Sequence, residues 1–208
     1  MNWLKIPVGV SDFGEIRKND YYYIDKSALI SDLLKKAGTK VTLITRPRRF
    51  GKTLGMSMLE HFFDIRKDSK KVFEGLEIVK QTKLCEEWMN QYPTIFVSFR
   101  QVDGLDFVGA YGMLEMVISD LFKEHLYLLD SENVSEFDKE IMKQLLWRKA
   151  SVIDVKGSLI LLTRMLKSHY GKQVVLLMDE YDVPVAKANN HGYYKEMLDV
   201  MKGLMQAL

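Results

Sequence analysis

The sequence predicts an α/β fold in which a mostly parallel sheet is covered by helices on both faces. Short apolar runs of the kind that forms buried strands occur at three places in the 208 residues. Stretches with helical apolar spacing separate these runs. Strands that alternate with helices form parallel sheets, because the crossover helices cover the faces.

The composition is that of a globular chain with one domain. Apolar residues make up 47% and charged residues 28% of the chain, which excludes disordered, fibrous and disulfide-scaffold proteins. This length suffices for one substantial core and is short for two, so we expect a single domain over residues 1–208. The net charge of +2 is too small to indicate nucleic acid or a membrane surface as a partner.

Nothing in the sequence is typical of secretion or of a membrane. The longest apolar runs, such as LILL and VVLLM, fall far short of a membrane span, and the N-terminus lacks the apolar core of a signal peptide. Cys85 is the single cysteine, which fits a reducing compartment. We therefore expect a cytoplasmic protein with no membrane partner. The four histidines show no metal-ligand spacing, so no zinc site is expected.

The first elements are an N-terminal segment, residues 1–38, and the strand that follows it. Within the segment, SALISDLLKKAG has helical apolar spacing and a terminal glycine. The run KVTLIT, residues 40–45, is typical of a buried strand. The next stretch, KTLGMSMLEHFFDIRK, is expected to be a helix with one apolar stripe formed by Leu54, Met58, Leu59, Phe62 and Phe63.

Two further strands are expected at PTIFVSF, residues 93–99, and at QVVLLMDE, residues 173–180. Two or three helices fill residues 106–170, and the last of them is closed by Gly171. The chain ends with the helix-like run YYKEMLDVMKGLMQAL. We expect its methionines Met197, Met201 and Met205 in the core, with an exposed partner-binding cluster as the alternative.

The loop TRPRRFGKTL, between the first strand and the next helix, carries the strongest functional signal. Phosphate-binding loops follow the pattern G-x-x-x-x-G-K-[ST], and this loop ends in Gly51, Lys52 and Thr53 but has Arg46 in place of the first glycine. A Gly-Lys-Ser/Thr triplet alone occurs by chance in roughly one in ten chains of this length. The flanking strand and helix favour a phosphate site, because they aim a helix N-terminus at the anion.

The residue types of the loop define the expected roles. The backbone at Gly51 cradles phosphates, Lys52 reaches the terminal phosphates and Thr53 holds Mg²⁺. The arginines of the loop are able to neutralise phosphate, to pair with the acids of DEYD or to remain solvated. The nucleotide-binding set is Arg48, Arg49, Phe50, Gly51, Lys52, Thr53 and Leu54.

The acids that end the run VVLLMDE supply the second half of such a site. A carboxylate at a strand end holds the water shell of the metal, a role expected for Asp179, and Glu180 is placed to polarise the attacking water. The alternative is that the two acids merely end a buried strand at its solvent edge. Loop and acids together predict a site for ATP and Mg²⁺ with Lys52 and Glu180 as catalytic residues, and Asp182 is a candidate to orient Glu180.

Six segments together resemble one known family. IPVGVSDFGEIR, YYYIDKSALI, RPRRFGKTL, VFEGLEI, YPTIFVSF and VVLLMDEYDVPV are similar to the AAA-ATPase-like domain of bacterial proteins. In that family Arg-Pro-Arg-Arg-Phe-Gly-Lys-Thr is the usual phosphate loop, so Arg46 in place of glycine is a family feature. The resemblance implies a P-loop NTPase fold in which a further strand, bearing a sensor residue, lies between the loop strand and the strand that ends in the acids.

The resemblance also implies what lies beyond this chain. Family members commonly continue into the sensor strand and a nuclease domain of the restriction-endonuclease type, whereas this chain stops at Leu208. We therefore expect a P-loop domain truncated before the sensor strand, which forms homo-oligomers if its open strand edges pair. Nucleic acid is expected as a partner only through the nuclease domain, outside this chain.

Three functions remain open at this point. The first is an ATPase that acts as a motor or switch for an attached effector. The second is a nucleotide-binding regulatory module with negligible hydrolysis, and the third and least favoured is a small-molecule kinase. In related ATPases the segment before the loop strand, here Ile6 to Phe13 with Arg17, holds the adenine. Pro7, Val8 and Phe13 are therefore candidate apolar contacts, with core packing as the favoured alternative. Asp25 in YIDKS is expected to cap a helix.

Overall fold

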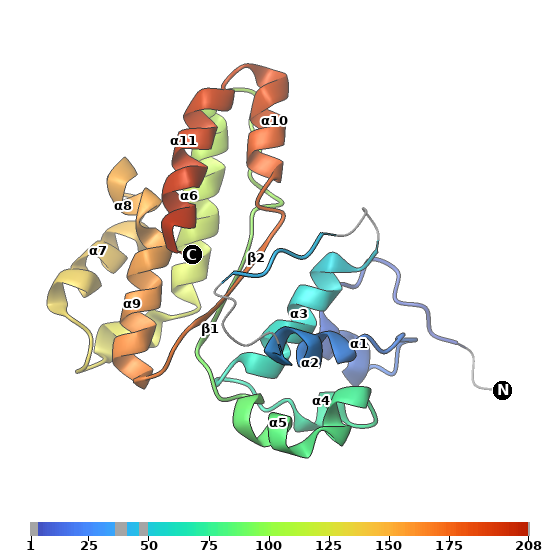
Figure 1. The fold of residues 1–208 in the computed structure, drawn as a ribbon. Helices are drawn as coiled ribbons and strands as arrows, with labels where there is room; N and C mark the ends of the chain where they lie inside the picture. Colours follow the sequence, from blue (N-terminus) through green and yellow to red (C-terminus); the bar gives the residue numbers. More distant parts are fainter. Residues whose placement is uncertain (1–3, 36–40, 46–49, 208) are drawn as a thin grey trace. The chain divides into compact units, whose positions relative to one another are not determined.

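The computed structural model describes residues 4–35, 41–45 and 50–207. The chain divides into two compact units, Met1–Thr94 and Ile95–Leu208, and each is described by itself (Figure 1). The single domain expected over residues 1–208 stays a prediction.

The first unit is built from short helices around α3, the helix that follows the phosphate loop. Its helices are α1 Phe13–Lys18, α2 Ala28–Lys35, α3 Lys52–Phe63, α4 Lys70–Phe73, η1 Glu77–Lys80 and α5 Thr82–Trp88. The expected helix at KTLGMSMLEHFFDIRK is thereby confirmed. Four of the five residues of its apolar stripe are buried, and Leu54 is half-buried.

Aromatic side chains form the core of the first unit. Phe13, Phe62 and Phe73 are fully buried. The ring centroids of Phe13 and Phe73 lie 4.8 Å apart, and those of Phe62 and Phe73 lie 5.5 Å apart. Tilted and edge-to-face rings at these distances stabilise a core beyond the effect of buried area. Because Phe13 belongs to α1 and Phe62 to α3, this core fixes α1 against the helix that opens at the loop.

The prediction of a buried strand before the loop is wrong for residues 41–45. These residues carry no strand, and the side chains of Val41 and Leu43 are 48% and 64% exposed. Residue Lys40 lies outside the described residues. Strand propensity measures how well side chains fit a pleated, half-buried surface. The run KVTLIT has that fit but no neighbouring strand pairs with it in the described structure.

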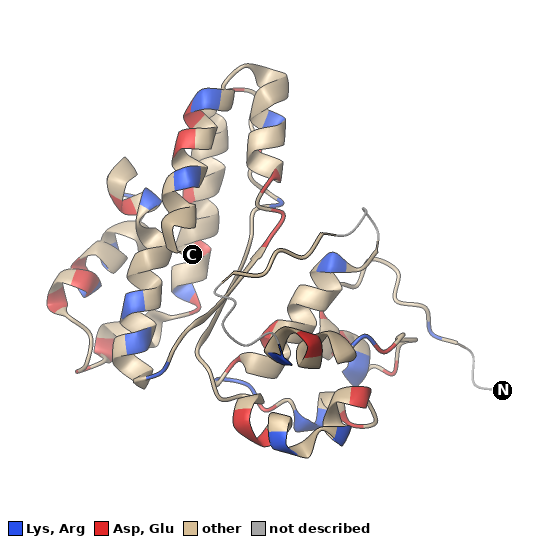
Figure 2. Ribbon diagram, viewed as in Figure 1, with Lys and Arg blue, Asp and Glu red and all other residues tan. Residues whose placement is uncertain are grey.

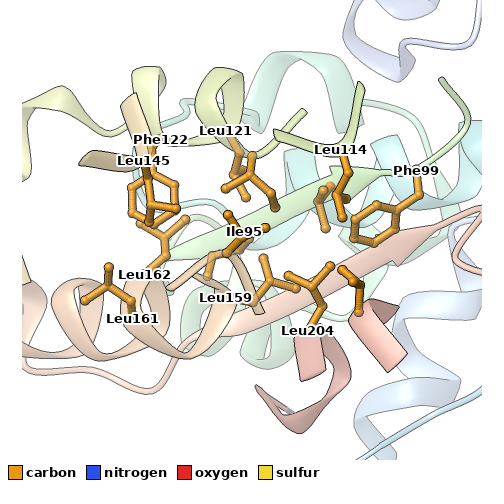
Figure 3. Packing of buried hydrophobic residues seen from close by; sticks show 14 of the residues in the cluster. Ile95, Phe99, Leu114, Leu121, Phe122, Leu145, Leu159, Leu161, Leu162 and Leu204 are labelled. Carbon is orange, nitrogen blue, oxygen red and sulfur yellow. The ribbon is translucent and has the colours of Figure 1, made fainter. Parts of the chain in front are cut away.

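The second unit combines a small sheet with longer helices. β1 Thr94–Ser98, whose first residue ends the first unit, and β2 Val175–Asp179 form a two-stranded sheet in which both strands run in the same direction (Figure 3). The helices are α6 Phe107–Lys123, η2 Leu126–Asp130, α7 Glu136–Leu146, α8 Val152–Lys156, α9 Ser158–Tyr170, α10 Val183–His191, α11 Tyr194–Leu204 and η3 Met205–Ala207. The α/β class and the parallel pairing are confirmed, whereas the P-loop arrangement of strands stays a prediction.

The core of the second unit lies between β1 and three helices. Ile95 lies in β1 and Phe99 directly follows it, and both side chains are fully buried. Figure 3 shows them among leucines of α6, α9 and α11. The buried positions of α6 include Leu114, Ile118, Leu121 and Phe122, whose spacing places them on one helical face. Met197 and Met201 of α11 are buried as well, so core packing is confirmed for these two methionines and an exposed cluster is wrong.

Local capping explains where the long helices begin and end. Asp106 caps α6 by accepting a hydrogen bond from the N–H of Gly109 at 2.8 Å. The C-terminal end of α9 is set by Gly171, which adopts the left-handed region with φ 64°. Glycine adopts this region without steric cost. The predicted end of this helix at Gly171 is confirmed.

Candidate functional site

The described end of the phosphate loop is a left-handed turn that opens α3. Gly51 is the N-cap of α3 with φ 76° and ψ 30°, a conformation that favours glycine because it has no Cβ. Among the described residues, no side-chain hydrogen bond caps this end of the helix. The first N–H groups of any helix lack an acceptor within the helix. The start of α3 therefore has the backbone geometry that anion-binding sites use.

The predicted nucleotide-binding residues follow one another along this turn. Phe50 is exposed, and Lys52, Thr53 and Leu54 are half-buried in the first turn of α3. Arg48 and Arg49, like Arg46, lie outside the described residues, so their roles stay predictions.

A second lysine lies at the same turn. The Nζ atom of Lys26 donates a hydrogen bond to the carbonyl oxygen of Phe50 at 3.3 Å. It also stands 3.5 Å from the position that a Cβ atom on Gly51 would occupy. No sequence pattern predicts a role for Lys26. Its only signal was membership of the run YIDKS, which matches the family in sequence without revealing a partner.

A polar cluster fastens the segment before the loop to α3. Asp12 caps α1 by accepting from the N–H of Glu15 at 2.6 Å, and its second carboxylate oxygen accepts from Ser57 Oγ at 3.2 Å. The same oxygen lies 3.4 Å from His61 Nε2. Ser57 Oγ in turn accepts from the N–H of Phe13 at 3.0 Å. Ser57 and His61 are four residues apart on α3 and face the same way, so together they hold α1 against this helix.

Burial sets the protonation of this cluster. Burial lowers the pKa of His61 below its usual value, the charge of Lys67 acts in the same direction, and the two outweigh the attraction of Asp12. For Asp12, burial raises the pKa, but the hydrogen bond from Glu15 N–H and the interactions with His61 leave the pKa of the carboxyl lowered. The fold therefore favours an ionised Asp12 beside a neutral His61.

Acidification from pH 7 to pH 5 is expected to lower the melting temperature of the protein through His61. An unfolded histidine titrates near pH 6.5, whereas the pKa of His61 is lowered in the fold. The unfolded chain thus gains the proton first, and stability is lost as the pH falls through this range. Melting curves of wild type and His61→Gln at pH 7, 6 and 5 measure the difference, with His191→Gln, at an exposed histidine of α10, as the control. Equal pH dependence of wild type and His61→Gln would contradict this account.

The candidate adenine contacts differ in burial within the first unit. Phe13 is a core residue, as the alternative held, whereas Val8 is 87% exposed, so core packing is wrong for Val8. Arg17 donates to the carbonyl oxygens of Val72 and Glu74 at 2.9 and 2.8 Å. Its guanidinium therefore binds the backbone at the C-terminal end of α4.

The two acids of the second unit lie where β2 ends. Asp179 is the last residue of β2 and is only 3% exposed, and its carbonyl oxygen accepts from the N–H of Phe99 at 3.0 Å. Glu180 follows with φ 53°, a left-handed backbone conformation that residues other than glycine seldom adopt. Strained residues of this kind cluster at functional sites, where the surrounding structure maintains them. A solvent edge does not account for the burial of Asp179.

The two halves of the predicted site belong to different units. Lys52 and Thr53 lie in Met1–Thr94, and Asp179 and Glu180 lie in Ile95–Leu208. Within each unit the residues lie together because they are consecutive in the chain. A joint site formed by all four residues stays a prediction.

Charges of both signs occur among the described helices of each unit. Both units carry Lys and Arg as well as Asp and Glu (Figure 2), although the charged residues of α9 are all basic, Arg164 and Lys167. None of the described helices has the length and apolar character needed to cross a membrane.

Comparison with known proteins places this chain. A family described as "Predicted AAA-ATPase" matches residues 7–208. The chain belongs to this AAA-ATPase-like family. A relative from Azotobacter chroococcum mcd 1, described as "Uncharacterized protein in vnfD 5'region", is 29% identical over 191 residues, which are 89% of this chain and 30% of the relative. The chain therefore spans less than a third of that relative. No solved structure matches this chain.

Family membership confirms the resemblance drawn from the six segments and supports nucleotide binding. It gives the turn at Gly51 a context in which an anion ligand is expected. Fusion to a nuclease domain stays a prediction.

Proposed function

We propose that this AAA-ATPase-like chain binds ATP with Mg²⁺ at the start of α3 and hydrolyses it, as the ATPase part of a protein that moves or switches an attached effector. The observation that supports this most is the left-handed Gly51 turn, followed at once by Lys52 and Thr53 in the first turn of α3. Gly51 has no side chain, so a phosphate group is able to approach the backbone at this helix N-terminus, where Lys52 lies beside it.

Phosphate and metal binding follow from the donor chemistry of the chain. Backbone N–H groups at Gly51 bind phosphate oxygens, and Lys52 neutralises their charge. The hydroxyl of Thr53 and the carboxylate of Asp179 are the hard oxygen ligands that Mg²⁺ prefers. Mg²⁺, when bound, neutralises the charge that develops on the phosphate oxygens during transfer.

Hydrolysis then needs a base for the attacking water. The carboxylate of Glu180 accepts the proton of this water as the oxygen attacks the terminal phosphorus atom, and ADP leaves. The left-handed backbone at Glu180 sets the direction in which its side chain leaves the chain. A fixed direction suits a base that has to accept a proton from one positioned water.

A nucleotide-binding switch with negligible hydrolysis is the second candidate. Within the part of the chain that the structure describes, residues 41–45, directly before the loop, form no strand, and four of the five are exposed. This favours the switch, because a loop that lacks strand support binds a ligand more readily than it aligns a reaction. Stoichiometric binding of ATP without release of phosphate would identify the switch. Release of phosphate with no added acceptor would identify the ATPase and argue against a kinase.

Removal of Mg²⁺ is expected to weaken ATP binding by roughly tenfold or more, since the metal reduces the repulsion between the phosphate oxygens. Thr53→Val replaces the hydroxyl by a methyl group of similar volume, and we expect it to lose most of the gain that Mg²⁺ gives. Titration of fluorescent ATP with and without EDTA measures both effects. Thr82→Val, at the first residue of α5, is the matched control. A response of Thr53→Val to Mg²⁺ equal to that of wild type would remove Thr53 as a metal ligand.

A further inference from the structure

We propose that Lys26 is a second lysine of the phosphate site and that its ammonium group contacts the phosphates of bound ATP. This inference rests on the proposed function of the loop. It adds a phosphate-binding residue from the segment before the loop, 24 residues from Phe50 along the chain.

The ammonium of Lys26 lies against the turn that is expected to hold phosphate. It donates to the carbonyl oxygen of Phe50 at 3.3 Å, on the side of Gly51 from which a side chain would project, where a Cβ atom would lie 3.5 Å away. The missing side chain at position 51 has one clear consequence. It permits the left-handed backbone, and a Cβ atom there would stand in ordinary van der Waals contact with the ammonium of Lys26.

The backbone that carries Lys26 is held in place on both sides. The carboxylate of Asp25 accepts from the N–H of Ser27 at 2.8 Å and from the N–H of Glu77 at 2.7 Å. The hydroxyl of Ser27, which is fully buried, accepts from the N–H of Ile78 at 3.1 Å. Asp25 thus fixes a turn against η1 and does not act as the helix cap expected from sequence. A lysine on a fixed turn loses less freedom on binding a ligand.

The carboxylate of Asp25 is occupied by these backbone groups. Burial raises its pKa, but the hydrogen bonds from the N–H groups of Glu77 and Ser27 leave the pKa lowered. Asp25 therefore carries its negative charge next to Lys26 in the chain while its oxygens accept from backbone N–H groups.

The charge of Lys26 is available for an anion. Within residues 4–35, 41–45 and 50–207, none of the ion pairs includes Lys26. Its hydrogen bond goes to a neutral carbonyl, at a distance near the upper limit for such bonds. An ammonium has three N–H donors, and bonds from it to anionic oxygens are about twice as strong as bonds between neutral groups. A phosphate at the turn would therefore attract the ammonium more strongly than Phe50 does.

The other interpretation is that Lys26 only shapes the loop through Phe50. The two differ in what a neutral donor achieves. Lys26→Gln retains an N–H donor for the carbonyl but has no charge, so it preserves a loop-shaping role and removes a phosphate contact. Lys26→Arg keeps the charge.

The test is the affinity of the protein for Mg-ATP and for inorganic triphosphate at two salt concentrations. We expect Lys26→Gln to weaken binding of both ligands by roughly 10-fold to 100-fold, as the loss of a charged hydrogen bond predicts, and to reduce the dependence on salt. Lys26→Arg is expected to stay within about threefold of wild type, because it retains the charge. Lys83→Gln, an exposed lysine of α5, is the control and is expected to bind as wild type does.

Failure of this inference and failure of the proposed function give different results. If wild type binds Mg-ATP, Lys52→Ala does not, and Lys26→Gln binds like wild type, Lys26 has no phosphate contact and the proposed function stands. Weaker binding by Lys26→Gln with the full salt dependence of wild type would also overturn the inference, since the lost contact would not be ionic. If wild type itself binds neither ligand, both proposals are wrong.

Discussion

Lys52→Ala is expected to abolish ATP binding at concentrations that saturate wild type. A charged hydrogen bond contributes about 1.5–3 kcal/mol, and a phosphate-loop lysine contacts more than one oxygen. The dissociation constant should therefore rise by a factor of roughly 100 or more. Isothermal titration with Mg-ATP measures the change. The backbone of α3 does not depend on this half-buried side chain, so the melting temperature without ligand should stay close to that of wild type.

The matched control for this variant is Lys71→Ala. Lys71 is an exposed lysine of the same unit, on α4. The substitution Lys71→Ala removes one positive charge from the same unit and leaves the charges of the loop unchanged. Equal affinity of wild type and Lys52→Ala would show that the start of α3 is not the nucleotide site.

Glu180→Gln is expected to bind ATP as wild type does and to release phosphate about 10²-fold to 10⁴-fold more slowly, the usual range for loss of a general base. The amide has the size of the carboxylate but does not take a proton from water. The ratio of turnover to affinity separates the two effects. Phosphate release under saturating ATP gives the turnover, and titration gives the affinity.

Glu196→Gln serves as the control for this second variant. Glu196 is exposed in the first turn of α11, in the same unit as Glu180. Normal hydrolysis by Glu180→Gln would remove Glu180 as the base, and loss of binding would assign it to the ligand contacts instead.

The parts of the fold that the sequence predicts well are those with local causes. The helices α6 and α9 have apolar residues on one face, and Gly171 marks the end of α9. The runs that became β1 and β2 are continuous apolar segments of strand length. Residues 41–45 have the same character, yet they form no strand. A strand needs a partner, and the partner depends on distant parts of the chain.

The residues of the candidate site likewise fall into those that the local sequence predicts and those that it does not. Gly51 and Lys52 follow from a motif of consecutive residues, and Asp179 and Glu180 follow from the end of an apolar run. Lys26 does not, because its place at the loop depends on the hydrogen bond from Glu77 to Asp25 across 52 positions of the chain.

The polar cluster on α3 likewise joins Asp12 to His61 across 49 positions. Neither contact has a spacing that a sequence pattern reveals.

The most direct test of the central claim, that the Gly51 turn binds ATP, is a thermal-shift titration of the protein with Mg-ATP. A ligand that binds only the native state at 100 times its dissociation constant adds about 2.7 kcal/mol to stability. This corresponds to a rise of roughly 5–10 °C in the melting temperature for a chain of this size. We predict such a rise for wild type and its absence in Lys52→Ala. An unchanged melting temperature for wild type at millimolar Mg-ATP would contradict the account.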